Sequence, residues 1–153
     1  MSSRVRIGVI GLGEAGSLIA AGLQAAGADV IGFDPVVPET PPVPLAPDVA
    51  AVVTGADIVI SINSSTAARK VAEQVAPLLG AGTVYADLNT GTPALKKALA
   101  GLFGDGVFAD VAIMKPVPGL AEKVPMGVAG PGARRIVDLL EPYGMNLEYV
   151  SDV

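Results

Sequence analysis

Residues 11–16 read GLGEAG and match the pattern G-x-G-x-x-G. Glycines at this spacing permit a tight turn, allow the backbone to approach a phosphate group closely, and let a helix pack against a strand. In this segment those roles would fall to Gly11, Gly13 and Gly16, in that order. The pattern by itself is weak, because turns built from small residues match it by chance, so its meaning depends on the elements around it.

The elements around these glycines have the required order. Residues 5–10 are rich in β-branched residues and predict a strand, and residues 14–27 are rich in Ala and Leu, end on a glycine and predict a helix. Residues 28–34 predict a second strand, which ends on Asp34. A glycine-rich turn between strand and helix, followed by an acidic residue after the next strand, predicts a dinucleotide site. The expected contacts in the turn are Gly11, Leu12, Gly13, Glu14, Ala15 and Gly16.

Asp34 indicates which dinucleotide to expect. Its carboxylate would accept hydrogen bonds from the adenosine ribose and would repel a 2′-phosphate, so NAD is expected in preference to NADP. Glu14 adds negative charge near the phosphates, which suits the helix dipole if the side chain points to solvent. The alternative is a plain strand–helix turn in which Asp34 is a solvated strand end.

The remaining sequence continues to alternate strands and helices. Residues 35–47 contain six prolines and predict a surface loop, since proline lacks the backbone N–H and restricts its predecessor. This alternation predicts an α/β fold of Rossmann type, with a doubly wound, mostly parallel sheet, in one domain over residues 1–153. Further strands are expected at residues 57–63, 82–88, 106–114, 125–130 and 146–150, and helices at 48–56, 64–80, 92–104 and 132–144.

The composition excludes several classes of protein. The chain of 153 residues is 51% hydrophobic and 16% charged, which is typical of a compact domain with both faces of its sheet covered. The absence of Cys and His excludes disulfides, thiolate nucleophiles and a Ser-His-Asp triad, and no metal site is expected. A net charge of −5 argues against nucleic acid or an anionic membrane as a partner.

The first residues superficially resemble a secretory signal. Arg4 and Arg6 precede an apolar stretch, but Glu14 and several glycines interrupt that stretch. No uninterrupted apolar run in the sequence reaches membrane-spanning length. A cytoplasmic protein is therefore expected.

Ligands of a doubly wound sheet bind beyond the carboxyl ends of its strands, and three segments are expected there. Two of them hold the candidate cofactor contacts Asn63, Ser64, Asn89 and Thr90, although ordinary helix capping explains such residues equally well. The third is FADVAIMKPVPG, residues 108–119. Its Lys115 is a weak catalytic candidate, because burial can lower the pKa of a lysine, but a solvated lysine at a strand end is commoner.

Three segments of the chain together resemble a known superfamily. They are residues 7–34, the run DLNTGTP at 87–93, and residues 108–119. The combination resembles the N-terminal cofactor domain of the β-hydroxyacid dehydrogenase and 6-phosphogluconate dehydrogenase superfamily, closest to its phosphogluconate dehydrogenase-like branch. DLNTGTP is similar to the family pattern D-x-S/N-T-x-x-P, which makes the resemblance more specific than the glycines do.

The resemblance implies an oxidoreductase that transfers hydride between NAD(P) and a small molecule. The substrate would be a hydroxy acid, or the related carbonyl or imine. The glycines of residues 11–16 would hold the pyrophosphate and Asp34 the ribose, and the loops of Asn63 and of Asn89 and Thr90 would border the nicotinamide half. The resemblance thus repeats, residue by residue, the site that the spacing predicts.

The sequence departs from the family pattern in its substrate loop. Where the family commonly has D-A-P-V-S-G-G, this chain has DVAIMKP at residues 110–116, so Met114 replaces a serine and Lys115 a glycine. These two replacements predict a more apolar mouth than a hydroxy acid would need. Lys115 would then at most orient the substrate.

Members of the family continue into a long helix that carries a catalytic lysine, and then into a helical domain. That catalytic and dimerisation domain is expected to be absent from this chain, which would bind NAD with little turnover alone. A homodimer would form through the missing region or through exposed apolar surface near the C-terminus. The alternative is a non-catalytic module that binds the nucleotide to sense it or to assemble with a partner.

Overall fold

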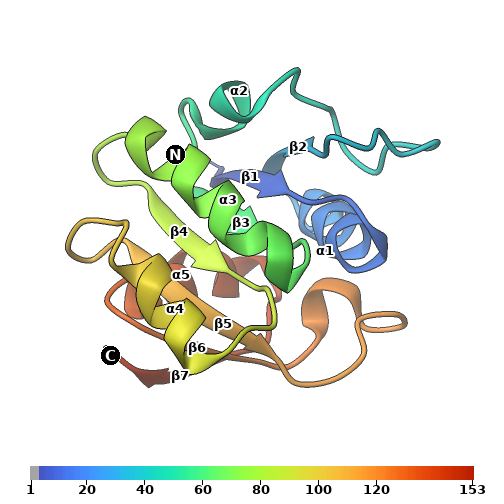
Figure 1. Ribbon diagram of the computed structural model, residues 1–153. Helices are drawn as coiled ribbons and strands as arrows, with labels where there is room; N and C mark the ends of the chain where they lie inside the picture. Colours follow the sequence, from blue (N-terminus) through green and yellow to red (C-terminus); the bar gives the residue numbers. More distant parts are fainter. Residues whose placement is uncertain (1–3) are drawn as a thin grey trace.

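A computed structural model describes residues 4–153 of the protein. Seven strands form one sheet in the order β2-β1-β3-β4-β5-β6-β7 (Figure 1). The first five in this order are parallel, β6 runs antiparallel to β5, and β7 is parallel to β6. The predicted α/β fold with a mostly parallel sheet is confirmed. The strands are β1 (Arg6–Ile10), β2 (Asp29–Phe33), β3 (Ile58–Ser61), β4 (Val84–Asp87), β5 (Phe108–Ile113), β6 (Met126–Ala129) and β7 (Leu147–Ser151).

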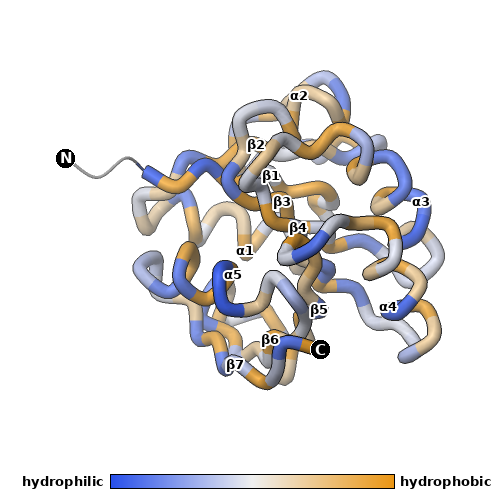
Figure 2. Tube along the Cα trace, turned by 90° about the vertical axis from the view of Figure 1, so that its left-hand side faces the viewer, coloured by the Kyte–Doolittle hydropathy of each residue, from blue (hydrophilic) through white to orange (hydrophobic). Residues whose placement is uncertain are grey.

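Helices cover both faces of the sheet and make two hydrophobic cores. Because side chains alternate along a strand, Ile7 and Val9 of β1 pack with α1 and α5, whereas Ile10 packs with α2 and α3 on the other face. Figure 1 shows α3 and α4 in front of the sheet, and Figure 2 shows the hydrophobic central strands between the helical layers. The helices are α1 (Glu14–Ala25), α2 (Val49–Val53), α3 (Ser65–Val75), α4 (Pro93–Ala100) and α5 (Ala133–Leu140).

Three of the helices have a side-chain N-cap, and a proline follows the end of one of these three. Asp48, Ser64 and Thr92 each accept a hydrogen bond from a backbone N–H in the first turn of the following helix, which satisfies a donor that the helix itself leaves free. Helix α3 is shorter than the predicted 64–80. It ends at Val75, and the chain tightens into a 3₁₀ turn, η1 (Ala76–Leu78), around Pro77, which has no N–H to continue the helix.

The proline-rich loop of residues 35–47 is attached to the edge of the sheet near its end. The Gly32 N–H donates to the Pro44 carbonyl oxygen over 2.9 Å, and the Ala46 N–H donates to the Gly32 carbonyl oxygen over 2.8 Å. Leu45 thereby forms an isolated parallel bridge with β2, and Val43 is buried in the core. The predicted surface loop is therefore only partly a free loop.

The segment between β5 and β6 folds back over the face of the sheet that α1 covers. The Met114 N–H donates to the Pro125 carbonyl oxygen over 2.9 Å and closes the connection. Val117 and Val124 are buried in the core beside α1, and a 3₁₀ turn, η2 (Ala121–Lys123), packs on that helix. The connection is thus fixed at both ends. No helix among residues 4–153 is both long and apolar enough to cross a membrane.

Candidate functional site

The site lies at β1, where the order in which successive strands are added across the sheet reverses. Strand β1 pairs with β2 on one side and with β3 on the other, so the loops that follow β1 and β3 diverge at the carboxyl edge. Clefts at such a switch point bind ligands in α/β proteins. A cleft of about 370 Å³ opens here, lined by Gly11, Gly13, Glu14, Ala15, Gly16, Asp34, Pro35, Ile62, Asn63 and Ala67.

The three glycines of the turn differ in the room that their surroundings leave for a side chain. Gly11 has φ +112°, and a Cβ added to it would lie 2.0 Å from the carbonyl oxygen of Ile62. A Cβ on Gly16 would lie 2.0 Å from the carbonyl oxygen of Gly11, so the helix approaches the turn too closely for any side chain. A Cβ on Gly13 would meet nothing within 4 Å. Gly13 therefore keeps the floor of the cleft low without being needed for packing.

Asp34 is tied to the glycine-rich turn. Its Oδ2 accepts a hydrogen bond from the Leu12 N–H over 2.7 Å, and its Oδ1 accepts one from the Val36 N–H over 2.8 Å. The carboxylate is therefore no freely solvated strand end, and each oxygen retains a lone pair for a further donor. Glu14 is exposed at the start of α1, in accord with the orientation that the helix dipole requires.

Two further clefts extend the site along the same edge of the sheet. One of about 540 Å³ lies between the starts of α3 and α4, and one of about 280 Å³ lies between α4 and β5. Thr90 and Gly91 line both of these clefts, so the two adjoin each other. The third cleft also brings in Asn89, Lys96 and Asp110. Ser64, the N-cap of α3, directly precedes Ser65 and Thr66, which line the larger of the two clefts.

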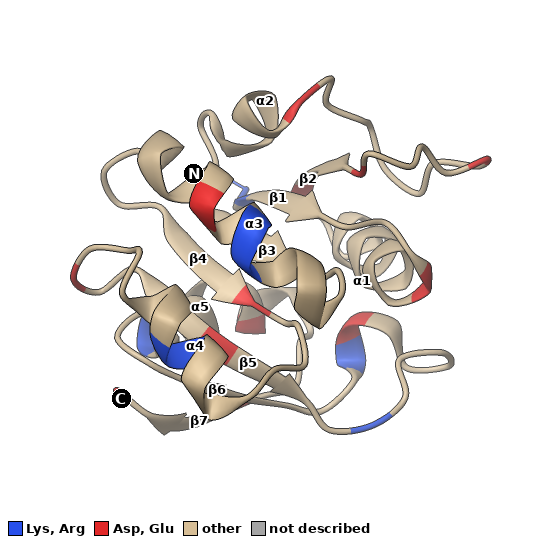
Figure 3. Cartoon of the chain, in the orientation of Figure 1, with Lys and Arg blue, Asp and Glu red and all other residues tan. Residues whose placement is uncertain are grey.

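An ion cluster forms the wall of the third cleft. Ser61, Asp87 and Asp110 are direct register partners on β3, β4 and β5, so their side chains form one row on the face that α4 covers. Lys96 of α4 lies above the row, with its Nζ 2.6 Å from Asp87 Oδ2 and 2.7 Å from Asp110 Oδ1. The side chains of Lys96, Asp87 and Asp110 are 13%, 1% and 40% exposed. Figure 3 shows acidic residues on β4 and β5 beside the basic residues of α4.

Asn89 connects this cluster to the dinucleotide cleft. Its Nδ2 donates to Asp87 Oδ1 over 2.7 Å and to Ser61 Oγ over 3.1 Å, and its Oδ1 accepts a short hydrogen bond from the Asn63 N–H. Asn63 Nδ2 donates to Ser61 Oγ over 2.9 Å. Asn63 and Asn89 are therefore held in one network. Neither side chain is a helix cap, although capping explained them equally well in the sequence.

Tyr85 lies two residues before Asp87 on the same face, with its ring centroid 4.5 Å from that of Phe103. Its hydroxyl has no hydrogen-bond partner among residues 4–153. Burial raises the pKa of Tyr85 well above its usual range, because the ionised form would be poorly solvated. Tyr85 therefore stays protonated at neutral pH and cannot serve as a general base there.

The sequence drew attention to Lys115, whereas the structure draws attention to Lys96. Lys115 is exposed, its neighbour Met114 is 58% exposed, and neither residue lines the three clefts described above. Lys96 is nearly buried between two carboxylates. A detectable signal for it existed in α4, since Lys96 precedes the buried Leu99 by three residues and so shares its face of the helix.

The fold and the glycine-rich turn at the switch point define a dinucleotide-binding domain. Residues 6–108 match the family described as the NAD binding domain of 6-phosphogluconate dehydrogenase. The chain belongs to this family. Its resemblance to the dehydrogenase superfamily, predicted from three sequence segments, is thereby confirmed.

Solved structures support this assignment over nearly the whole chain. A conserved hypothetical protein from Sinorhizobium meliloti 1021 is 35% identical, with a TM-score of 0.89 over 99% of this chain and 56% of that one. MTH1747, a conserved protein of unknown function described as similar to 3-hydroxyacid dehydrogenases, is 25% identical, with a TM-score of 0.84 over 95% of this chain and 57% of that one.

A third solved structure shares the fold at lower identity. The 3-hydroxyisobutyrate dehydrogenase of Mycobacterium tuberculosis is 22% identical, with a TM-score of 0.83 over 99% of this chain and 56% of that one. The chain therefore spans little more than half the length of these relatives. A comparison with curated proteins finds no match.

Proposed function

We propose that this chain is the cofactor domain of an oxidoreductase that transfers hydride between NAD and a hydroxy acid or the related carbonyl or imine. The observation that carries the proposal is the groove of three neighbouring clefts from the glycine-rich turn to Asp110, at the carboxyl edge of a sheet of this family. The adenosine half would bind beside Asp34 and the nicotinamide half beside Asn63 and Asn89. NAD supplies the hydride acceptor, and the residues of this chain bind and orient it.

The residues of the first cleft suit a pyrophosphate. Helix α1 begins at Glu14, and the first backbone N–H groups of a helix have no partners within it and carry partial positive charge. The open space above Gly13 lets the phosphates approach those groups, because no side chain intervenes. Leu12 and Ala15 would contact the dinucleotide through their backbone. Ser64 and Thr90 would line the path between its two halves.

The direct test of this proposal is titration calorimetry of the chain with NADH. Binding is expected, with little or no oxidation or reduction of added hydroxy acids, because the chain spans about half the length of relatives such as the Sinorhizobium meliloti protein. We propose that turnover, and the homodimer, require a further helical domain. A chain that binds neither NADH nor NADPH would refute the proposed function.

Replacing Asp34 by asparagine is expected to relax the preference for NADH. The amide oxygen of the new side chain can still accept one backbone hydrogen bond, while the charge that would repel a 2′-phosphate is lost. The ratio of the NADPH to the NADH dissociation constant should fall by about tenfold, as calorimetry would measure. Asp29→Asn, at the exposed opposite end of β2, is the matched control and should leave the ratio unchanged. An unchanged ratio in Asp34→Asn would contradict the role of Asp34.

A non-catalytic module that senses NAD or assembles with a partner is the second candidate. Lys115, the catalytic candidate from the sequence, is exposed and lies outside the three clefts, so it is poorly placed for proton transfer. We assign Lys115 at most the orientation of a substrate, beside the apolar Met114. Turnover in the presence of a further helical domain separates the two candidates, since a sensor would bind NADH and oxidise or reduce no added substrate.

A further inference from the structure

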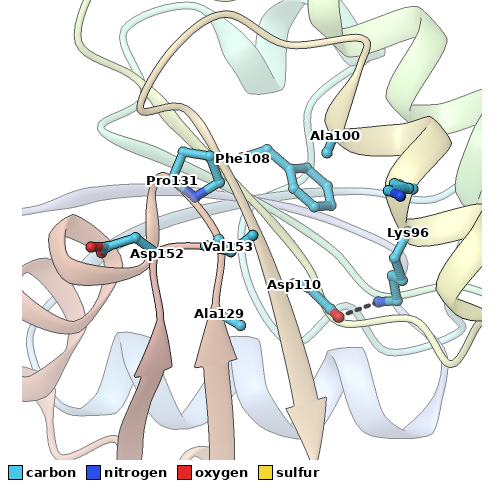
Figure 4. Close-up of a pocket in the computed structure, with 10 residues that line it drawn as sticks. Lys96, Ala100, Phe108, Asp110, Ala129, Pro131, Asp152 and Val153 are labelled. Carbon is cyan, nitrogen blue, oxygen red and sulfur yellow. Dashed lines mark ion pairs between the residues drawn. The ribbon is translucent and has the colours of Figure 1, made fainter.

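The ammonium group of Lys96 closes a hydrogen-bonded chain that ends in the dinucleotide cleft. Lys96 Nζ contacts Asp87 Oδ2, Asp87 Oδ1 accepts from Asn89 Nδ2, and Asn89 Oδ1 accepts from the backbone N–H of Asn63. Figure 4 shows Lys96 reaching from α4 to Asp110 on β5. Helix α4 is thereby connected through side chains to the loop after β3.

The series of hydrogen bonds from Lys96 to Asn63 is buried where it passes Asp87. This side chain is 1% exposed, and its partners in the chain are Lys96 on one oxygen and Asn89 on the other. A carboxylate that is this well buried requires a charge partner, because the alternative is an ionised group without solvation. Lys96 therefore determines where the Asp87 carboxylate lies, and the carboxylate determines the orientation of the Asn89 amide.

The Asn89 amide in turn fixes the loop that borders the first cleft. Its oxygen holds the Asn63 N–H, its nitrogen contacts Ser61 Oγ, and the Asn63 amide donates to the same Ser61 oxygen. Asp34 lines the same cleft as Asn63, but its hydrogen bonds run to the backbone of Leu12 and Val36 and not to the Asn63–Asn89 network. The side-chain hydrogen bonds that hold Asp34 are therefore separate from those that hold the Asn63 loop.

We propose that Lys96 is a positioning residue for the nicotinamide half of the bound dinucleotide. It acts through Asp87 and Asn89 on the Asn63 loop, whereas Asp34, beside the adenosine half, is held by other hydrogen bonds. This inference rests on the proposed function, in which Asn63 and Asn89 border the nicotinamide. Loss of the ammonium would free the Asp87 carboxylate and, with it, the Asn89 amide that holds the loop.

The inference is tested by calorimetry of the Lys96→Met variant with two probes. NADH spans both halves of the groove, whereas ADP-ribose lacks the nicotinamide. The dissociation constant for NADH should rise about tenfold, the typical effect of one lost charge-assisted hydrogen bond, while that for ADP-ribose should stay within about twofold. Lys97→Met removes an exposed charge from the next position of α4 and should change neither constant.

Each other outcome overturns the inference in a recognisable way. Equal weakening of both probes would show a general loss of structure, and unchanged binding of both would show that Lys96 does not act on the loop. If Lys96→Met does not fold by circular dichroism, Lys96→Gln replaces it, because it removes the charge but keeps a polar side chain, and binding of NADH should still weaken more than that of ADP-ribose. A wild-type chain that binds neither probe would refute the proposed function itself, and the inference with it.

Discussion

The Gly11→Ala variant is expected to lose more than about 3 kcal/mol of folding stability, because the new methyl group combines backbone strain with a collision. Gly11 has φ +112°, where side chains are disfavoured, and its Cβ would lie 2.0 Å from the Ile62 carbonyl oxygen and 2.6 Å from Asn63 Oδ1. Both neighbours belong to the loop after β3, so relief of the collision would separate β1 from β3. Urea unfolding followed by circular dichroism measures the loss.

Gly13→Ala is the matched control, two residues along the same turn. A Cβ at this position would meet nothing within 4 Å, and Gly13 has an extended conformation that alanine also adopts. The cost in stability should be no more than about 1 kcal/mol, the usual range for alanine at a helix N-cap. NADH binding should nevertheless fall by about tenfold or more, since the methyl group would lie where the pyrophosphate approaches. Equal stability losses in the two variants would contradict this division of roles.

The Asp87→Asn variant is expected to cost about 3 kcal/mol of folding stability, since it removes one partner of a buried ion pair. Lys96 would keep Asp110, whose side chain is 40% exposed, but it would lose the fully buried carboxylate 2.6 Å away. The double variant Asp87→Asn, Lys96→Met removes both charges and should recover part of the loss. The free energy of unfolding in urea, measured for the single and double variants, tests both statements.

An exposed ion pair on the neighbouring helix provides the control for that measurement. Arg69 and Glu73 of α3 lie one turn apart with 3.7 Å between Arg69 Nε and Glu73 Oε1, and both side chains are more than half exposed. Glu73→Gln should change stability by less than about 0.5 kcal/mol, because solvent screens such a pair. If Asp87→Asn costs no more than Glu73→Gln, the cluster below α4 is not the buried ion pair described here.

The order of strands and helices could be predicted from the sequence because local signals agree with the fold. Each strand of the first five is a short apolar run, and glycine or a capping side chain marks many of the boundaries. The glycine-rich turn is an extreme case, since two of its three glycines leave no room for a Cβ. The antiparallel direction of β6 was not predicted. Its connection to β5 contains no α-helix, and a crossover helix is what usually returns a chain for parallel pairing.

The buried ion cluster could not be predicted with the same ease. Lys96 and Lys97 are adjacent and chemically identical, and only the helical period places Lys96 on the face of Leu99. The partners Asp87 and Asp110 lie on different strands, so their meeting depends on strand register, which hydrophobic pattern alone does not fix for strands that are buried on both faces. The role of Asn89 could not be predicted for the same reason, because its partners Ser61 and Asn63 come from β3 and the loop that follows it.

The attachment of the proline-rich loop to β2 also blocks this edge of the sheet from pairing with a strand of another molecule. β2 is an outermost strand, and its free N–H and C=O groups could otherwise template pairing with another molecule. Gly32 already donates to Pro44 and accepts from Ala46, so the middle of that edge is occupied. The flanking prolines of residues 35–47 have no N–H to extend the ladder. The segment therefore makes this border of the molecule resistant to strand addition and aggregation.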